Sequence, residues 1–281
     1  KPLLESTLLA LHGDEAAKPR ARAPGASGVP DLAGLEVLVA EDHPVNQLLV
    51  RRLLERAGCR VSVAGDGREA LELATARPFD VILMDVQMPE MGGHEATRRL
   101  REREAGGARR TPVIALTAHA HESDRQQCLA AGMDDYLPKP VNPQALHEAL
   151  ERWAPLRASG RRDPVAAPSP QGQAAPGEST LFQRATFEES IGNDPSLFAS
   201  LIDLFFEVQP DRLRELGEHL ARGDTEAGRR TAHTLVGSFR TMAMPRLGDL
   251  AAGIERHLKA GDVDPAREDY AALEGEFPRL A

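Results

Sequence analysis

Two side chains of this sequence can form a covalent bond to phosphorus. Asp85 ends the apolar run 81–84, and His233 lies inside the segment 232–238. Carboxylate oxygens and imidazole nitrogens both act as nucleophiles that accept a group and release it again. An aspartate and a histidine of this kind in one chain can pass a phosphoryl group between them. Phosphoryl transfer is therefore our leading hypothesis.

Further polar side chains lie at the ends of other apolar segments. Glu41 and Asp42 follow one such segment, Thr117 ends another, and Lys139 follows a third. Because the carboxyl ends of parallel strands meet at one edge of a sheet, we expect all of them beside Asp85. Clustered carboxylates repel one another unless a cation joins them, and oxygen ligands suit Mg²⁺. We predict a Mg²⁺ site at which Lys139 neutralises phosphate charge.

Two hydrophobic periods indicate the elements that position these residues. Between residues 35 and 153, short continuous apolar strands alternate with segments of helical period. This alternation predicts a parallel sheet covered by helices on both faces. Acids at strand ends also cap helices, and we give Asp66 that simpler role. Strands are expected at 35–40, 60–63, 80–84, 112–117 and 135–137.

Residues 181–281 show only the helical period, which predicts an antiparallel helix bundle. Apolar stripes are expected at 197–205, 213–220, 232–242 and 247–254. Helix starts are expected near Pro195, Pro210, Asp224 and Pro245, and helix ends near Gly223 and Gly261.

The surroundings of His233 distinguish it from the other histidines. His233, Gly237 and Arg240 recur at i, i+4 and i+7, about 100° around the helix from the inward-pointing Ala232. We expect this stripe to face solvent. Glycine inside a helix costs ~1 kcal/mol relative to alanine, and its use here would let another protein approach the imidazole. An exposed histidine beside an incidental glycine is the alternative interpretation.

Several polar residues near the predicted carboxylate site have simpler interpretations. Asn46 and Gln47 are interpreted as polar residues of a first helical turn. For His119, two residues after Thr117, a role in phosphate hydrolysis and a solvated loop position are equally open. Cys59 and Cys128 are isolated, without disulfide or metal spacing, and are expected to be small buried residues in a reducing compartment.

Charge and composition exclude some partners. A net charge of −9 argues against nucleic acid. No apolar run approaches the ~20 residues that span a bilayer, so we expect no membrane contact by this segment. We expect a cytoplasmic location, with any inner-membrane anchor in another part of a parent protein. The chain begins with Lys, which indicates a fragment.

Two segments are typical of linkers. Residues 14–34 are rich in Ala, Pro, Gly and Arg, and residues 154–180 are rich in Pro, so neither can bury much apolar surface. They delimit a domain at 35–153 and a second at 181–281. The beginning of residues 1–13, Lys-Pro-Leu, echoes the Lys-Pro-Val that follows the last predicted strand.

Four stretches carry a resemblance to a known family: 38–47 (LVAEDHPVNQ), 82–93 (ILMDVQMPEMGG), 114–118 (IALTA) and 132–140 (GMDDYLPKP). With them, residues 35–153 resemble the receiver domain of two-component signalling. The resemblance implies a flavodoxin-like fold with five parallel strands. It also suggests that residues 1–13 are the tail of a preceding receiver-like domain.

The resemblance also implies roles for single residues. Asp85 would form the aspartyl phosphate. Mg²⁺ would be held by Asp42, Asp85 and the backbone carbonyl of Gln87, with Glu41 acting mostly through water. Thr117 and Tyr136 would be switch residues that report phosphorylation. The Lys139–Pro140 bond is expected to be cis.

The helical segment resembles a histidine-phosphotransfer (Hpt) domain. The matching stretches are 191–198 (IGNDPSLF), 221–224 (ARGD) and 232–238 (AHTLVGS). Two positions depart from the family pattern: Val236 stands where a cation is usual, and Ala243 where a glycine is usual. We hypothesise that Arg229 and Arg240 replace the missing cation, because their spacing from His233 puts them near the same helix face.

These observations predict a phosphorelay segment, similar to the C-terminal part of a hybrid sensor histidine kinase. An upstream histidine kinase domain, expected in the same parent polypeptide, would phosphorylate Asp85. The group would pass to His233 and then to a separate response regulator receiver. No ATP-binding glycine-rich box occurs, so we interpret the chain as phosphotransfer modules rather than a kinase.

Three other functions are alternatives to a phosphorelay. A degenerate bundle would only dock partners while Asp85 acts as a phosphorylation switch. A Mg²⁺-dependent phosphatase would need a second acid two residues after Asp85, where Gln87 stands. Flavin binding would need a phosphate-cradling loop after the first strand, where Glu41 and Asp42 would repel phosphate.

Overall fold

The computed structural model describes residues 32–107, 109–117, 122–153 and 181–280. Residues 32–281 form one compact unit. The expected tail at 1–13, the linker at 154–180, and the linker at 14–34 up to residue 31 lie outside the described residues, as does His119. Leu32, at the end of that first linker, is buried among the residues of the following domain.

A five-stranded parallel sheet is the centre of the α/β domain, residues 32–153. The strands lie in the order β2-β1-β3-β4-β5. Every residue of β3 and β4 is buried. This burial on both faces accounts for the continuous apolar sequence of these strands up to their last residues. The flavodoxin-like fold is confirmed. The strands are β1 (Glu36–Ala40), β2 (Arg60–Ala64), β3 (Val81–Asp85), β4 (Val113–Thr117) and β5 (Asp135–Pro138).

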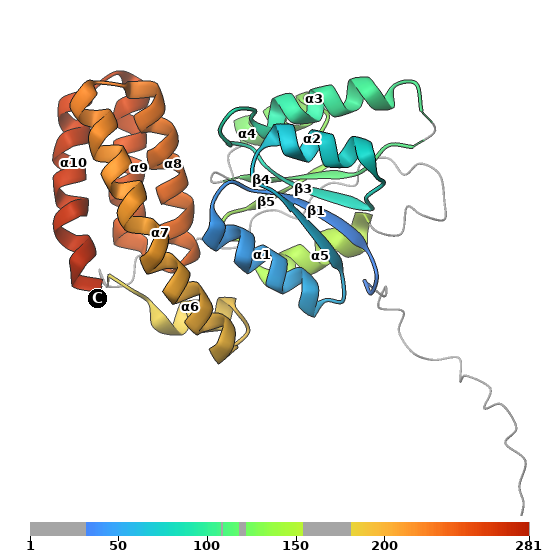
Figure 1. The fold of residues 1–281 in the computed structure, drawn as a ribbon, viewed down its shortest axis with the longest axis horizontal. Helices are drawn as coiled ribbons and strands as arrows, with labels where there is room; N and C mark the ends of the chain where they lie inside the picture. Colours follow the sequence, from blue (N-terminus) through green and yellow to red (C-terminus); the bar gives the residue numbers. More distant parts are fainter. Residues whose placement is uncertain (1–31, 108, 118–121, 154–180, 281) are drawn as a thin grey trace, which may run out of the picture. The chain divides into compact units, whose positions relative to one another are not determined.

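Helices cover both faces of this sheet (Figure 1). One apolar layer lies under α1 (Pro44–Arg56) and α5 (Pro143–Trp153). The opposite layer lies under α2 (Gly67–Ala76), α3 (Gly93–Glu104) and α4 (Glu122–Ala130). As expected, Asp66 caps α2, since its carboxylate accepts hydrogen bonds from the backbone of Arg68 and Glu69.

The strand order reverses between β1 and β3, and this reversal positions the acidic side chains. The two strands are parallel neighbours with Ala40 beside Met84. The next residues, Glu41 and Asp85, therefore leave the sheet side by side at its carboxyl edge. In doubly wound sheets this is the place where ligands bind.

Residues 181–280 form the predicted helix bundle. Its long helices pack side by side around a common centre: α7 contacts α8 and α10, and α9 also contacts α8 and α10. The centre is apolar, with Phe205 and Phe239 in edge-on contact. The helices are α6 (Arg184–Ser190), α7 (Pro195–Arg222), α8 (Thr225–Thr241), α9 (Pro245–Ala260) and α10 (Val263–Glu276), followed by the short helix η2 (Phe277–Leu280).

The expected helix start at Pro210 is wrong, because α7 runs through it. Proline inside a helix costs about 3 kcal/mol, since it removes a backbone hydrogen bond. Here Phe205 and Leu213 are buried on either side of it, and burial of such a side chain contributes about 1.5–3 kcal/mol. Continuous burial along one face therefore outweighs the proline. Helices α6 and α10 were not expected.

The other expected helix boundaries of the bundle are confirmed. Asp194 and Asp224 cap the starts of α7 and α8 with their carboxylates. Gly223 and Gly261 end α7 and α9 at φ values of 68° and 85°, a left-handed conformation that favours glycine.

Helix α1 belongs to two cores. Val50 and Leu54 pack on the sheet, whereas Val45 and Leu49 belong to the same apolar cluster as the bundle interior. Accordingly, α1 contacts α7 and α8. This packing brings the carboxyl edge of the sheet to the face of α8 that carries His233.

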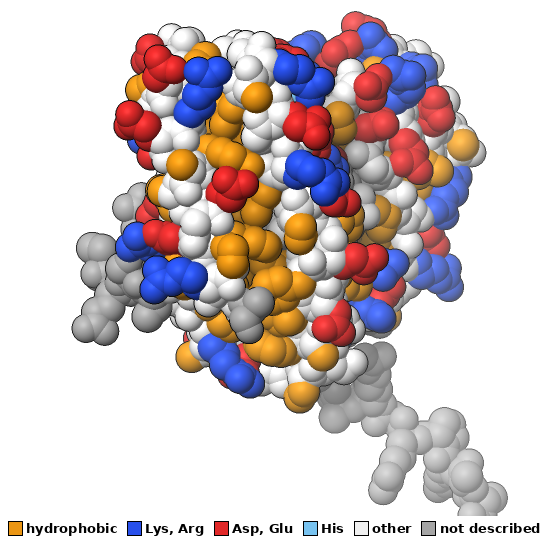
Figure 2. All heavy atoms as spheres, turned by 60° about the vertical axis from the view of Figure 1, so that its left-hand side comes forward, with side chains coloured by type: hydrophobic (Ala, Val, Ile, Leu, Met, Phe, Trp, Pro, Cys, Tyr) orange, Lys and Arg blue, Asp and Glu red, His pale blue; other side chains and the backbone are white. Residues whose placement is uncertain are grey.

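The outer surface shows mixed polarity. On the face brought forward in Figure 2, a band of hydrophobic side chains runs between groups of charged ones. Many of the charged residues pair along their own helices, as Arg222 does with Glu218. Among the described residues, no helix is both long and apolar enough to cross a bilayer.

Candidate phosphotransfer site

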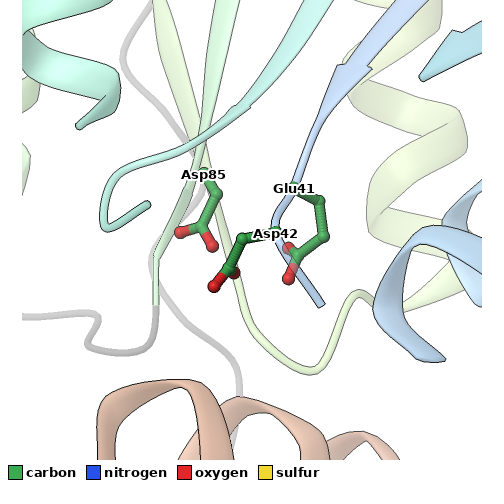
Figure 3. Close-up of side chains that lie close together, drawn as sticks. All are labelled: Glu41, Asp42 and Asp85. Carbon is green, nitrogen blue, oxygen red and sulfur yellow. The ribbon is translucent and has the colours of Figure 1, made fainter. Parts of the chain in front are cut away.

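Three carboxylates converge at the carboxyl edge of the sheet. Glu41, Asp42 and Asp85 each offer an oxygen within 4.8 Å of the others, and their carboxyl groups lie close together in Figure 3. Glu41 and Asp85 are 1 % and 2 % exposed. The convergence predicted from the strand ends is therefore observed.

Lys139 joins the cluster from the loop after β5. Its ammonium nitrogen lies 2.6 Å from an oxygen of Glu41 and 2.6 Å from an oxygen of Asp85. Burial alone would lower the pKa of Lys139, but these two carboxylates raise it above its ordinary value. The ammonium group is therefore charged at neutral pH. The Lys139–Pro140 bond is cis, as expected.

The cluster carries more negative charge than Lys139 balances. Burial, together with the charges of Glu41 and Asp85, raises the pKa of Asp42 to about 7. Burial also raises the pKa of Asp85 to about 6, although Lys139 opposes the rise. A cation among these oxygens would reverse both shifts. Three oxygen donors with surplus negative charge therefore fit a divalent metal ion.

The other predicted site residues surround the carboxylates. Thr117 is buried at the end of β4, and its carbonyl accepts a hydrogen bond from the Lys139 amide at 2.7 Å. Gln87 follows β3, and its backbone amide donates to Asp85 at 3.2 Å. Tyr136 is half-buried on β5, beside the apolar layer under α2, α3 and α4.

Asn46 and Gln47 are more than polar residues of a first turn, so that interpretation is wrong. The Asn46 amide donates to the Glu41 carboxylate at 2.8 Å, and the Gln47 amide donates to the Glu41 carbonyl at 2.6 Å. Both side chains thus hold Glu41 in place. Their position in the first turn of α1, a few residues after Glu41, makes this contact possible.

His233 is buried, and the prediction that it faces solvent is wrong. It is 6 % exposed, because α9 lies on one side of it and the α/β domain on the other. Its Nδ1 lies 3.0 Å from a carboxylate oxygen of Glu255 on α9. Since a carboxylate only accepts, Nδ1 carries the proton and Nε2 keeps its lone pair.

No local motif of the sequence contains Glu255, so sequence patterns alone do not indicate this residue. It lies on α9, 22 residues from His233 along the chain. The one available signal is an acid next to the apolar stripe of that helix, where Ile254 and Leu258 are buried. A buried acid requires a partner, and an unassigned histidine is a suitable one.

One carboxylate of the cluster, Asp42, and His233 line the same cavity of about 460 Å³, together with Gln87 and Thr234 among others. The Thr234 hydroxyl donates to an Asp42 oxygen at 3.2 Å. A Cβ added to Gly237 would lie 3.5 Å from the Asn46 amide nitrogen, so the glycine permits close approach.

The two departures from the Hpt pattern have structural counterparts. Val236 is fully buried in the core cluster that includes the bundle interior. Ala243 has a φ of 52°, a left-handed conformation in which glycine would carry no strain. Arg229 lines the cavity and pairs with Glu226. Arg240 is not among the lining residues and lies over Gly248 of α9.

Comparisons with protein families agree with this geometry. Residues 37–151 match the family model of the response regulator receiver domain. Residues 200–281 match the family model of the Hpt domain.

Curated relatives extend across both domains. The signal transduction histidine-protein kinase BarA of Escherichia coli K12 is 32 % identical over 235 residues, which are 82 % of this chain and 25 % of BarA. The virulence sensor protein BvgS of Bordetella bronchiseptica is 33 % identical over 261 residues, 90 % of this chain and 20 % of BvgS. The chain therefore spans a quarter or less of the length of these relatives.

Among solved structures, the receiver domain of sensor histidine kinase PA1611 from Pseudomonas aeruginosa is 46 % identical, with a TM-score of 0.41. The match covers 44 % of this chain and 99 % of that one. From the two family models and the site geometry, this chain is a response regulator receiver domain followed by an Hpt domain, the domain types of phosphorelay signal transduction.

Proposed function

We propose that this chain is the middle part of a phosphorelay in which Asp85 accepts a phosphoryl group and hands it to His233. The donor would be a phosphohistidine of an upstream histidine kinase domain. The final acceptor would be the receiver of a separate response regulator. Thr117 and Tyr136 would report the state of Asp85 as switch residues. The two domain types in this order support the proposal.

The first step forms an acyl phosphate. A carboxylate oxygen of Asp85 attacks the donor phosphorus, the P–O bond forms and the P–N bond of the donor breaks, with the electron pair returning to the imidazole. Lys139, 2.6 Å from Asp85, would neutralise charge on the phosphoryl oxygens, and the Thr117 hydroxyl would donate a hydrogen bond to one of them.

Mg²⁺ would be held by Asp42, Asp85 and the Gln87 carbonyl, with Glu41 contributing through water. When bound, it supplies positive charge to the phosphoryl oxygens during transfer. The surplus negative charge of the cluster supports this assignment.

The second step moves the group to the bundle. The lone pair on Nε2 of His233 attacks the phosphorus of the Asp85 phosphate. The P–N bond forms, and the P–O bond breaks to regenerate the carboxylate. Glu255 accepts from Nδ1 and stabilises the positive charge that develops on the ring.

The observation that carries the proposal is the shared cavity. His233 and the metal-site carboxylate Asp42 line the same space, and Thr234 connects them through its hydrogen bond to Asp42. Because Asp42, which lies next to Asp85 in the carboxylate cluster, lines the same space as His233, we expect transfer to require little rearrangement.

Phosphorylation of the intact chain tests the proposal. Incubation with acetyl phosphate and Mg²⁺ should give two phosphate adducts, a base-labile one at Asp85 and an acid-labile one at His233. Mass spectrometry after acid or base treatment distinguishes them. Asp85→Asn should remove both, His233→Gln only the second, and EDTA should suppress both. Label on His233 in the Asp85→Asn variant would contradict the proposed direction of transfer.

Val236 favours a second candidate function. Without a cation at this position, the bundle would serve only to dock partners of the phosphorylated receiver. In that case His233→Gln would leave signalling through this chain unchanged.

A further inference from the structure

A chain of buried polar groups crosses from the receiver to the Hpt domain next to the phosphotransfer cavity. His43, in the loop after β1, places Nε2 3.4 Å from the side-chain oxygen of Gln209 on α7. The Gln209 amide nitrogen lies 2.5 Å from the Ser238 hydroxyl on α8. All three side chains are 0 % exposed.

The backbone amide of Val45 sets the direction of the hydrogen bonds among His43, Gln209 and Ser238. Nδ1 of His43 accepts from the Val45 amide at 3.3 Å, so the ring proton is on Nε2. Nε2–H therefore donates to the Gln209 oxygen. The Gln209 side-chain nitrogen then donates to the Ser238 hydroxyl. The Gln209 side-chain oxygen is therefore available to accept from the receiver.

Gln209 is a fully buried polar side chain near an apolar part of the contact between the two domains. Val45 and Leu49 of α1 pack into the bundle core beside it, and such contacts tolerate any apolar side chain of similar size. The Gln209 oxygen is more selective. In a free Hpt domain water can satisfy it, but a docked receiver without a donor would bury it unpaired, which costs about 1–3 kcal/mol.

We propose that the Gln209 oxygen selects the receivers that exchange phosphate with His233. A compatible receiver presents a side-chain N–H donor directly after its acidic pair, as His43 follows Glu41 and Asp42 here. A receiver with an apolar side chain at this position is rejected. This inference rests on the proposed relay. The same recognition would apply to the receiver of this chain and to the receiver of the downstream response regulator.

The test uses the full chain, labelled with acetyl phosphate and Mg²⁺. The readout is the ratio of phosphate on His233 to phosphate on Asp85 in the same sample, so altered receiver labelling cancels. His43→Leu should lower this ratio about tenfold to a hundredfold, the factor that corresponds to an unpaired buried acceptor. His43→Gln, which keeps an N–H donor, should stay within a few-fold of wild type.

A double variant separates recognition from misfolding. His43→Leu combined with Gln209→Leu removes both partners, so its ratio should recover toward wild type relative to His43→Leu alone. Gln144→Leu, an exposed substitution on α5, is the matched control. A wild-type ratio in His43→Leu, or no recovery in the double variant, would overturn the proposal.

A phosphate-free measurement distinguishes this inference from the relay itself. In the ¹H–¹⁵N spectrum of the unphosphorylated chain, His43 should show a slowly exchanging Nε2–H proton that Gln209→Leu abolishes. If that proton is protected but no label reaches His233, the relay fails and the pairing holds. If the proton exchanges rapidly with solvent in the wild-type chain, the pairing is wrong whatever the phosphate does.

Discussion

In the proposed transfer, the reactivity of His233 would depend on the Glu255 carboxylate. Glu255 accepts from Nδ1 at 3.0 Å, which directs the Nε2 lone pair away from α9. A negative charge at this distance also stabilises the ring as it becomes cationic during attack on phosphorus. The side chain therefore sets both the tautomer and the nucleophilic strength of His233.

Glu255→Gln keeps an acceptor for Nδ1–H but removes the charge. We expect phosphate transfer from Asp85 to His233 to slow about tenfold, within the range seen when a partner of a reactive ligand is changed. Rapid-quench measurement of label on His233 gives the rate, and Glu218→Gln on exposed α7 surface is the control. An unchanged rate would show that Glu255 only fills space.

Lys139 is the cation that holds the acidic cluster together in the metal-free receiver. Lys139→Met leaves Glu41 and Asp85 buried without it, so we expect a loss of about 3–5 kcal/mol in the free energy of unfolding. Mg²⁺ should restore part of this loss, because it returns positive charge to the carboxylates. Urea unfolding with and without Mg²⁺ measures both effects.

Lys259→Met, at an exposed position on α9, is the matched control for that measurement. Equal unfolding midpoints for the two variants would contradict the role given to Lys139.

At the scale of elements, the first residue of α3 restricts the backbone of Asp85. Gly93 lies against the strand end, and a Cβ there would come within 2.1 Å of the Asp85 carbonyl oxygen. Its amide also donates to the Val86 carbonyl at 2.9 Å. The start of α3 therefore has no room for a side chain at position 93.

Gly93→Ala must displace the end of β3. We expect a loss of stability of about 1–3 kcal/mol, as for other overpacked sites, and at least a tenfold fall in acetyl-phosphate labelling of Asp85. Gly106→Ala, just beyond α3, meets no atom within 4 Å and should behave as wild type. Equal labelling of the two variants would refute the packing argument.

The two apolar layers of the receiver each contain one cysteine. Cys59 lies in the layer under α1 and α5, and Cys128 in the layer under α2, α3 and α4. Burial, with the nearby charge of Asp124, raises the pKa of Cys128 to about 11. Burial also raises the pKa of Cys59. Both thiols are therefore protonated at pH 8.

Because only the thiolate reacts, iodoacetamide should leave the native chain unmodified at pH 8. Modification of Cys128 should increase as pH rises toward 11, and both cysteines should react at pH 8 in denaturant. Intact-mass measurement counts the adducts. Fast modification of the native chain at pH 8 would mean that one of the two layers is open.

Strand ends of a parallel sheet must meet at one edge, so the cluster around Asp85 followed from local patterns. The partners of His43 and His233 did not, because Gln209 and Glu255 lie on other helices and belong to no local motif. Pro210 does not begin a helix as expected, because its cost in free energy is smaller than the stabilisation from the buried side chains on both sides of it.

At the scale of the whole molecule, α1 couples the two domains. It places Val50 and Leu54 in the receiver core and Val45 and Leu49 in the bundle core. The solvent-facing histidine predicted from helix periodicity is therefore covered in the described structure. Periodicity identifies the outer face of a bundle, but it does not show what lies on that face.

In the proposed relay, the same packing would require the receiver of this chain and that of a downstream response regulator to use one surface of the bundle. His233 lies in the cavity that the receiver closes, next to Thr234 and Asp42. The receiver must move away before a second receiver can take the group. The proposed relay would therefore alternate between a closed state for loading His233 and an open state for unloading it.

The most direct test of the relay is a single-turnover chase in the intact chain. Asp85 is labelled with acetyl phosphate and Mg²⁺, the donor is removed by rapid desalting, and label on each residue is followed by quenching and mass spectrometry. The relay predicts that label lost from Asp85 appears on His233 before inorganic phosphate accumulates, and that His233→Gln abolishes this intermediate. Decay of the Asp85 phosphate directly to inorganic phosphate, with His233 never labelled, would contradict it.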